Sequence, residues 1–263
     1  MRTPANRTQV ITAEFEAKGA VERDGFAVVP NVLTLAQIDR LRSVLDDARD
    51  IAQTCRTGAV YGVRNLLDVA EVSNLAADPA IRRFIEPIVG VSAIPVRALF
   101  FDKTPDANWP VLWHQDLTIA VAERHDLKGW GPWSIKAGVT HVEPPARLLA
   151  AMLTIRLHLD DCHADNGPLR VMAGSYAEGR LTRDRIKTIR EAAPERIVTA
   201  PLGSALLMRP LLLHASSPAK RPKRRRVVHV EFAPRDLLPL PLTWAATSNT
   251  NQKLHSQNFA QPA

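Results

Sequence analysis

His114 and Asp116 are separated by one residue, and a second histidine, His214, follows 98 residues after Asp116. Side chains at this spacing on an extended segment point to the same face, because a strand alternates with period two. A distant histidine on a neighbouring strand would complete a set of two histidines and one carboxylate. Such a set holds Fe(II) and leaves coordination positions open for substrates and oxygen.

Two other His-x-Asp triplets must be told apart from this one. His163-Ala-Asp165 lies in CHADNG, whose Asp, Asn and Gly are typical of a turn. His158-Leu-Asp160 shares one strand face with Thr154 and Arg156, which points either to solvent or to a polar barrel interior. His114 stands at the end of an extended run and before a long loop, where rigid support meets open space. We therefore take the first triplet as the candidate ligand pair.

Arg225 adds a second chemical feature to the far half of the chain. His214 is expected at the end of one strand (210–215) and Arg225 at the start of the next (226–233). A hairpin or similar return would bring both residues to the same end of a sheet. Arginine can grip a carboxylate bidentately. A metal and a fixed guanidinium together suit a small dicarboxylate cosubstrate.

The elements that must position these residues fall into two parts. The first part reads as helices over 9–23, 35–52 and 79–89, with a short strand over 25–32 and a capping box at Thr34 to Gln37. The second part predicts short strands, as in a sandwich or barrel. These expected strands are 94–102, 111–119, 149–159, 168–172, 196–199, 204–208, 210–215 and 226–233. The Trp-rich segment 120–148 is expected to be an irregular wall or lid over a pocket.

Composition limits the class of protein. With 263 residues and 46% hydrophobic residues, the chain fits one globular domain. We expect a helical part over about 9–90, a β core over about 93–235 and a tail over 236–263. No apolar run suits a membrane span, and the N-terminus has no secretory pattern. Cys55 and Cys162 alone suggest free thiols in a reducing compartment, so a cytoplasmic location is expected.

The net charge of +7 has one conspicuous source, the cluster from Lys220 to Arg226. Such a cluster can bind nucleic acid or phosphate groups. No aromatic residues interleave the charges, as they would on a stacking surface. A solvated loop between strands is therefore the favoured interpretation, and nucleic acid is not an expected partner.

The chain resembles the phytanoyl-CoA dioxygenase family of Fe(II)/2-oxoglutarate oxygenases. The resemblance covers about residues 20–235 and is carried by motifs in order and spacing. These are GFAVVPNVLTLAQIDRLR (25–42), FDKTP (101–105), WHQDLT (113–118), LDDCHADNGPLRVMAGS (159–175), LLLHASSP (211–218) and RRVVHVEF (225–232). The implied fold is mainly β, a double-stranded β-helix or jelly roll of the cupin type with helices packed outside.

The resemblance implies a role for individual residues. His114, Asp116 and His214 would ligate Fe(II), and Arg225 would bind the distal carboxylate of 2-oxoglutarate. Ser216 and Lys103 match positions that can reach the same cosubstrate. Gln115 would point away from the ligands. The implied reaction uses O2 to hydroxylate a small molecule and releases succinate and CO2.

The chain departs from the family pattern at two positions. Gly174-Ser175-Tyr176 stands where many members of the family have Gly-Ser-His. Arg156 stands where many members carry Trp, and it could bind the cosubstrate or a substrate carboxylate. We take the region of Trp130, Trp133 and His141 as the specificity wall, with Gln115 as a further substrate-side position. Asp116 disfavours a halogenase, in which chloride occupies that place.

Several alternatives stay open. The same site could perform desaturation or epimerisation, or the fold could be a metal-binding barrel without oxygenase activity. The substrate and the oligomeric state are not determined by the sequence.

Overall fold

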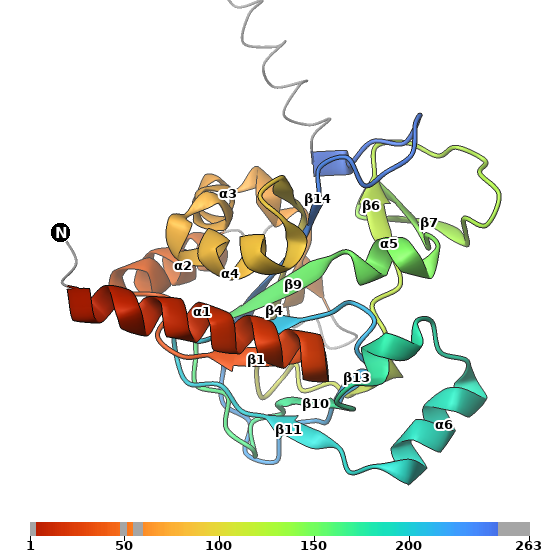
Figure 1. Ribbon diagram of the computed structural model, residues 1–263. Helices are drawn as coiled ribbons and strands as arrows, with labels where there is room; N and C mark the ends of the chain where they lie inside the picture. The colour runs from red at the N-terminus through yellow and green to blue at the C-terminus, as the bar shows by residue number, and fades with distance from the viewer. Residues whose placement is uncertain (1–3, 48–51, 55–59, 247–263) are drawn as a thin grey trace, which may run out of the picture.

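The computed structural model describes residues 4–47, 52–54 and 60–246, which form three antiparallel sheets, with the first four helices together on one side and α5 and α6 elsewhere (Figure 1). The helices are α1 (Pro4–Asp24), α2 (Leu35–Asp47), α3 (Ala70–Ala77), α4 (Pro79–Val89), α5 (Ala146–Ala150) and α6 (Arg183–Ala192), with 3-10 turns η2 (Leu66–Asp68) and η3 (Ser175–Glu178). The strands are β1 (Phe26–Val29), β2 (Ala52–Thr54), β3 (Val60–Val63), β4 (Ala93–Lys103), β5 (Val111–His114), β6 (Ile119–Val121), β7 (Trp133–Lys136), β8 (Val139–Val142), β9 (Leu153–His158), β10 (Leu169–Val171), β11 (Arg196–Val198), β12 (Ala205–Met208), β13 (His214–Ser216) and β14 (Arg225–Pro234).

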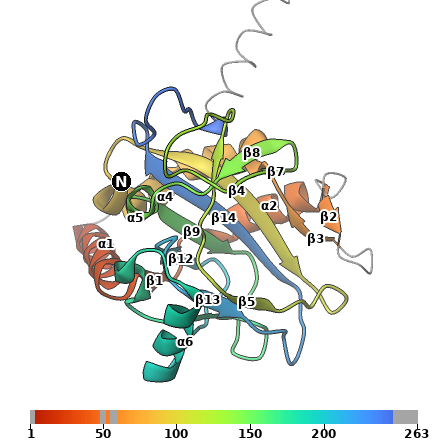
Figure 2. The ribbon, with the colours of Figure 1, turned by 90° about the vertical axis from the view of Figure 1, so that its right-hand side faces the viewer.

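Two of the sheets face each other. The major sheet has seven strands in the order β1-β12-β9-β14-β4-β3-β2, and the minor sheet has four in the order β11-β10-β13-β5. Figure 2 shows β14 between β4 and β9, with β13 and β5 side by side below them. The Lys103 ammonium of β4 bonds the Ser216 hydroxyl of β13, so the two sheets are in contact. This pair of antiparallel sheets agrees with the expected jelly roll.

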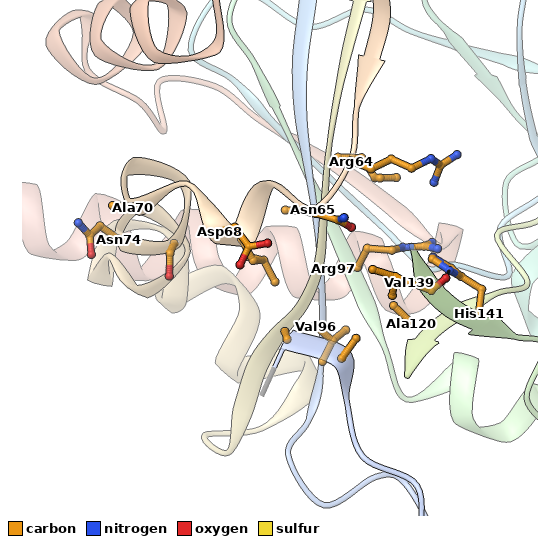
Figure 3. A pocket seen from close by; sticks show the side chains of 16 residues that line it. Arg64, Asn65, Asp68, Ala70, Asn74, Val96, Arg97, Ala120, Val139 and His141 are labelled. Atoms are coloured by element: carbon orange, nitrogen blue, oxygen red, sulfur yellow. Dashed lines mark hydrogen bonds between the residues drawn. The ribbon is translucent and has the colours of Figure 1, made fainter. Parts of the chain in front are cut away.

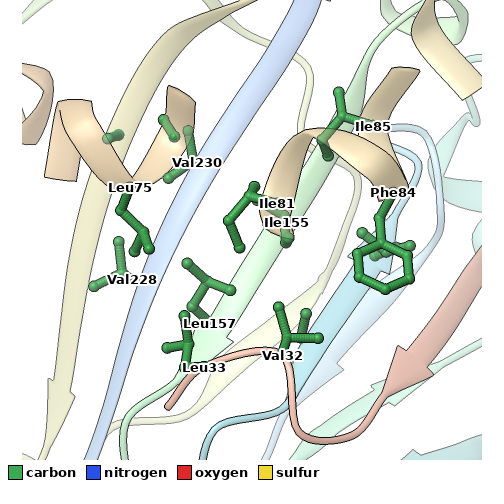
Figure 4. Packing of buried hydrophobic residues seen from close by; sticks show 14 of the residues in the cluster. Val32, Leu33, Leu75, Ile81, Phe84, Ile85, Ile155, Leu157, Val228 and Val230 are labelled. Atoms are coloured by element: carbon green, nitrogen blue, oxygen red, sulfur yellow. The ribbon is translucent and has the colours of Figure 1, made fainter. Parts of the chain in front are cut away.

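The outer face of the major sheet is covered by the N-terminal helices. Alternate residues of the strands, such as Leu157 on β9 and Val228 on β14, pack against Ile81 and Phe84 of α4 in one apolar cluster (Figure 4). The opposite alternation then turns polar side chains inward, toward the minor sheet. Alternation places one face of each strand in the apolar core and the other face in the polar interior between the sheets.

Local sequence explains where the helices begin and end. Thr34 and Gln37 form the expected capping box, in which the Gln37 amide N–H donates to Thr34 Oγ1 and the Thr34 N–H donates to Gln37 Oε1. Asp78 caps α4 in a similar way by accepting from the Ala80 N–H at 2.8 Å. The prediction that helix 35–52 continues beyond Asp47 falls mostly outside the described residues. The prediction for Cys55 falls wholly outside them.

Three strand expectations need correction. Residues 111–119 are not one strand, because β5 ends at His114 and β6 begins only at Ile119. Residues 210–213 form a buried turn, so His214 begins a strand rather than ending one. The segment 149–159 starts inside α5 and becomes a strand at Leu153. At 210–213 an apolar run is buried without being extended.

The segment 120–148 is also more ordered than expected. It contains β7 and β8, which pair with β6 in a third sheet of order β6-β8-β7. Val142 of this sheet packs with Leu149 and Trp244 in a separate apolar cluster. In the described part of the chain, no helix is long and apolar enough to cross a membrane.

Candidate metal and cosubstrate site

The two histidines of the predicted ligand set face each other across neighbouring strands. His114 ends β5, His214 begins β13, and the two are direct partners in the antiparallel register. Their ring centroids are 4.2 Å apart. The register shifts immediately after His214, which lets the chain leave the strand on both sides of the pair.

Each of these rings is held by its own backbone. His114 Nδ1 lies 2.8 Å from the Leu112 carbonyl oxygen, and His214 Nδ1 lies 2.9 Å from that of Leu212. A carbonyl oxygen only accepts, so Nδ1 carries the proton and donates in both rings. The lone pairs of both Nε2 atoms are therefore free for a metal ion. Hydrogen bonding of the second ring nitrogen is the usual support for a histidine ligand.

Asp116 completes the set. One carboxylate oxygen lies 3.7 Å from His114 Nε2 and the other 3.9 Å from His214 Nε2, and the ligand atoms of all three residues lie within 4.8 Å of one another. Asp116 Oδ2 is buried without a hydrogen-bond partner. A buried, unpaired carboxylate oxygen facing two imidazole nitrogens fits a divalent cation.

Electrostatics keep these groups in their ligating forms. Burial alone would raise the pKa of Asp116, but the nearby His214, His229, His114 and Arg97 together hold this pKa below its usual value. Burial lowers the pKa of His214 to about 4 and outweighs the opposite effect of Asp116. At neutral pH the site therefore offers a carboxylate and a neutral imidazole, as metal binding requires.

A cluster of buried cations lies beside the triad. Lys103 pairs in register with Arg225 across β4 and β14, and its ammonium donates to Ser216 Oγ at 2.8 Å and to the Ser217 carbonyl at 3.0 Å. Arg225 is 4% exposed, and its Nη1 contacts Cys162 Sγ at 3.8 Å. Within the described residues, no carboxylate forms an ion pair with Lys103, Arg156 or Arg225.

The cluster requires an anion. Burial, and after it the charge of Arg225, lowers the pKa of Lys103 to about 7 and that of Arg156 to about 10. The Nε atoms of Arg156 and Arg225 also have no hydrogen-bond partner. Buried charges are costly unless they are paired. A dicarboxylate between the metal position and Arg225 would supply the missing charge, so these residues fit 2-oxoglutarate.

A chain of hydrogen bonds crosses the inner face of the major sheet below the triad. Arg156 Nη1 donates to His229 Nδ1 at 3.0 Å, and His229 Nε2 donates to Glu231 Oε1 at 3.2 Å. Glu231 in turn forms a short ion pair with Arg97. Arg97 Nη1 then donates to Thr118 Oγ1 at 3.3 Å. His229 is thus buried with both of its ring nitrogens hydrogen-bonded.

The structure separates the four residues that the sequence suggested for the substrate side. Gln115 is fully used elsewhere, because its amide bonds the backbone of Gly179, Leu211 and Leu181. Trp130 and Trp133 pack against the apolar cluster around Val142 and do not line the cavity described next. His141 does line it. The geometry therefore favours His141 alone among the four.

The cavity has a volume of about 360 Å3 and lies between the segment 64–74, β4 and the third sheet (Figure 3). Sequence reasoning missed two of its basic residues, Arg64 and Arg97. Arg97 had a usable signal, because it alternates with Leu99, Phe101 and Lys103 on an expected strand. Glu231 could have been found in the same way from its alternation with Arg225.

The remaining departures have structural explanations. Tyr176 donates its hydroxyl to the Glu22 carbonyl and packs its ring on Gly25, whose φ of +85° and missing Cβ allow the contact. The basic cluster is not simply a solvated loop. Residues 220–223 are exposed, but Arg224 bonds Asp102 at 2.9 Å and Arg226 bonds Asp160 at 2.9 Å. Arg224 and Arg226 of the cluster thus hold the fold together.

Comparisons with known proteins agree with this geometry. A sequence model of the family described as phytanoyl-CoA dioxygenase (PhyH) matches residues 21–227. The chain is also 24% identical over 252 residues to L-proline trans-4-hydroxylase of Streptomyces griseoviridis, covering 82% of this chain and 85% of that protein.

Solved structures share the fold. EctD from S. alaskensis with bound Fe superposes with a TM-score of 0.65 at 15% identity, over 84% of this chain and 76% of EctD. The non-heme alpha ketoglutarate dependent epimerase SnoN from nogalamycin biosynthesis gives 0.63 at 18% identity, over 88% of this chain and 90% of SnoN. The chain spans half the length of another match, EvdMO1. The predicted jelly-roll fold is confirmed.

Proposed function

The chain belongs to the phytanoyl-CoA dioxygenase family, and from this premise we propose that it hydroxylates an unactivated C–H bond of a small organic substrate. It is an Fe(II)/2-oxoglutarate-dependent oxygenase, with 2-oxoglutarate and O2 as cosubstrates. The observation that carries the proposal is the convergence of His114, Asp116 and His214, whose ligand atoms lie within 4.8 Å of one another.

We assign each residue a role on this basis. The triad holds the iron at one face and leaves the other face open. Arg225 binds the distal carboxylate of 2-oxoglutarate, and Lys103 supplies a second positive charge, held by Ser216. Arg156, anchored on His229, lies on the same inner face and adds to the positive potential there.

When bound, the iron with 2-oxoglutarate and O2 supplies an oxidant able to attack an unactivated C–H bond, while the cosubstrate leaves as succinate and CO2. The protein provides orientation and a dry site. The backbone-bonded histidines fix the ligand directions, and the buried cations fix the cosubstrate. The 360 Å3 cavity beside Arg97 supplies the space for a small molecule.

The relatives differ in the reaction that their names state. The L-proline trans-4-hydroxylase favours hydroxylation, whereas the epimerase SnoN has the same fold. Desaturation or epimerisation at the same site is therefore the alternative. The mass of the product decides between them, since hydroxylation adds one oxygen, desaturation removes two hydrogens and epimerisation leaves the mass unchanged.

The cofactor assignment is tested by anaerobic titration of the protein with Fe(II) and 2-oxoglutarate. We expect a weak visible charge-transfer band that is lost in His114→Ala. His163→Ala is a matched control, because His163 belongs to another His-x-Asp triplet and its side chain is exposed. Absence of the band in the wild-type protein, or its persistence in His114→Ala, would contradict the assignment. A metal-binding barrel without oxygenase activity would bind iron and yet form no succinate.

A further inference from the structure

The 360 Å3 cavity is lined by residues near Asp116 and by none of the triad residues or the cosubstrate cations. Ala120 of β6, which follows Asp116 by four residues, contributes to its lining, as do Arg97 of β4 and His141 of β8. Arg97 also bonds Thr118, two residues after Asp116. A molecule in this cavity would therefore lie beside the triad, on the side opposite to Arg225 along the hydrogen-bonded chain from Arg156 to Arg97.

The wall nearest the metal site is strongly basic. Arg64 and Arg97 line it and point their guanidinium groups to the same side as His141 (Figure 3). Lys136 lies beside this wall, and its ammonium shares the Thr118 hydroxyl with Arg97 at 3.4 Å and 3.3 Å. Among the described lining residues, Asp68 is the one acidic residue, and Figure 3 shows it away from these cations.

The charge of this wall is only partly balanced by the protein. Glu231 neutralises Arg97 and also accepts from His229. Lys136 forms no ion pair with a carboxylate among the described residues. Burial, followed by the charges of Arg97 and Arg64, lowers its pKa. Lys136 and Arg97 thus share one nearby carboxylate, Glu231, which His229 also uses, and such a half-buried pair of cations suits an anionic group.

His141 adds a specific polar contact. It is 3% exposed, its Nδ1 lies 3.0 Å from the Val139 carbonyl, and its Nε2 is buried with no hydrogen-bond partner. Because Nδ1 must donate to that carbonyl, Nε2 is an acceptor. Burial, followed by the charge of Arg97, lowers the pKa of His141 to about 4, so it stays neutral. An unpaired buried acceptor calls for a donor.

We propose that the substrate carries a carboxylate, bound by Arg64, Arg97 and Lys136, and an N–H or O–H group that donates to His141 Nε2. Oxidation of that substrate rests on the proposed function, but its binding does not. Arg225 and Lys103 on one side and Arg64 and Lys136 on the other then keep two anions apart. The cosubstrate goes to the first pair, and the substrate goes to the second.

The test compares small carboxylic acids with their own primary amides, which have the same shape without the charge. The probes are pipecolate, cyclohexanecarboxylate and hexanoate, each with its amide. Binding is measured by saturation-transfer NMR on Zn(II)- and 2-oxoglutarate-loaded protein, which needs no turnover. We expect at least one acid to bind, with its amide at least tenfold weaker, and pipecolate to exceed cyclohexanecarboxylate because it has an N–H.

Variants locate the site. Lys136→Gln and Arg64→Gln should each weaken binding of the acid at least tenfold while the affinity for 2-oxoglutarate stays within twofold. Lys187→Gln is the control, because Lys187 is an exposed residue of α6 whose pairing with Glu191 is solvent-exposed. His141→Phe should remove the preference for pipecolate over cyclohexanecarboxylate.

Three results would overturn the inference: amides that bind as well as acids, no acid bound by any measure, or acid binding unchanged in both Lys136→Gln and Arg64→Gln. The outcome for the proposed function is read separately from the Fe(II) and 2-oxoglutarate band. Acid binding in a protein that forms no band would contradict the function and leave the anion site standing.

Discussion

Three histidines of this protein make the same local hydrogen bond from the imidazole ring to the backbone. His114, His141 and His214 each direct Nδ1 to the carbonyl oxygen two residues earlier, at 2.8, 3.0 and 2.9 Å. The bond fixes the tautomer and points Nε2 away from the backbone. In two of the three, Nε2 faces Asp116, and the third residue, His141, lines the cavity. One side-chain conformation thus prepares both ligation and substrate recognition.

His158 is a different kind of histidine, since both of its ring nitrogens are buried without partners. Burial, and after it the charges of Arg156 and Arg225, lowers its pKa to about 3. The unfolded state takes up a proton below its ordinary pKa of about 6.5, whereas the folded state does not. Stability is therefore complete above that value and is lost as the pH falls toward 3.

This titration predicts a pH-dependent effect of His158→Leu. Relative to wild type, the variant should gain about 2 kcal/mol of unfolding free energy between pH 8 and pH 5, from 1.36 kcal/mol per pH unit below 6.5. Urea unfolding at both pH values measures the difference, in which titration of the metal ligands cancels. His163→Leu, at an exposed position, should show no such change. A gain that does not depend on pH would mean that His158 takes up its proton over the same pH range in the folded and unfolded protein.

At the scale of elements, the sequence predicts best where alternation is regular. The expected strand 94–102 is β4, and 226–233 is β14, because both alternate between the helix-covered core and the polar interior. Strand prediction fails at 111–119 and 210–215. There the chain leaves the sheet to bring Asp116 toward His214, and the apolar run Leu211–Leu213 is buried as a turn. The strand prediction therefore fails at the two places where the backbone leaves the sheet next to the metal ligands.

The same reasoning explains which site residues could be found. His114, Asp116, His214 and Arg225 have types and spacing that indicate chemistry on their own. Arg97 and Glu231 acquire meaning only through the register of β4 with β14, which places them opposite each other across 134 residues. Helix α6 is hard to predict because its apolar stripe consists of Ile186 and Ile189 alone in a charged segment, and none of its residues is buried.

Gly167 connects a turn to the cosubstrate site. Its φ is +64°, and an added Cβ would lie 2.9 Å from the Ser217 carbonyl oxygen and 3.3 Å from Lys103 Nζ. Its carbonyl oxygen accepts from Ser216 Oγ at 3.2 Å. A side chain here would disturb the two contacts that hold the Lys103 ammonium.

We therefore expect Gly167→Ala to lower the unfolding free energy by roughly 2 to 3 kcal/mol, combining left-handed backbone cost with the clash. Its affinity for 2-oxoglutarate should fall about tenfold. Gly129→Ala is the matched control, because Gly129 has a φ of +82° but nothing within 4 Å of an added Cβ. It should show the backbone cost, about 1 kcal/mol, and unchanged affinity. Equal affinities of the two variants for 2-oxoglutarate would mean that Gly167 does not support the cosubstrate site.

For the whole molecule, the distribution of charge links stability to ligand binding. The interior between the sheets holds Lys103, Arg156 and Arg225, and no carboxylate of the described residues forms an ion pair with them. Like charges in a buried space repel, and each has lost its hydration. The apolar clusters on the helix side therefore stabilise the fold, whereas the buried cations between the sheets destabilise it. Binding of a dianion should neutralise these positive charges and so stabilise the folded protein.

This balance predicts a large thermal shift with 2-oxoglutarate. At one hundred times Kd, the cosubstrate should add about 2.7 kcal/mol of stability, which for a chain of this size raises Tm by roughly 5 to 10 °C. Differential scanning fluorimetry under anaerobic conditions with Fe(II) measures it. Arg225→Ala should lose most of the shift, because the distal carboxylate then has no guanidinium partner. Lys223→Ala, exposed two residues earlier, should keep it. A full shift in Arg225→Ala would show that another cation, Arg156 first among them, holds the distal carboxylate.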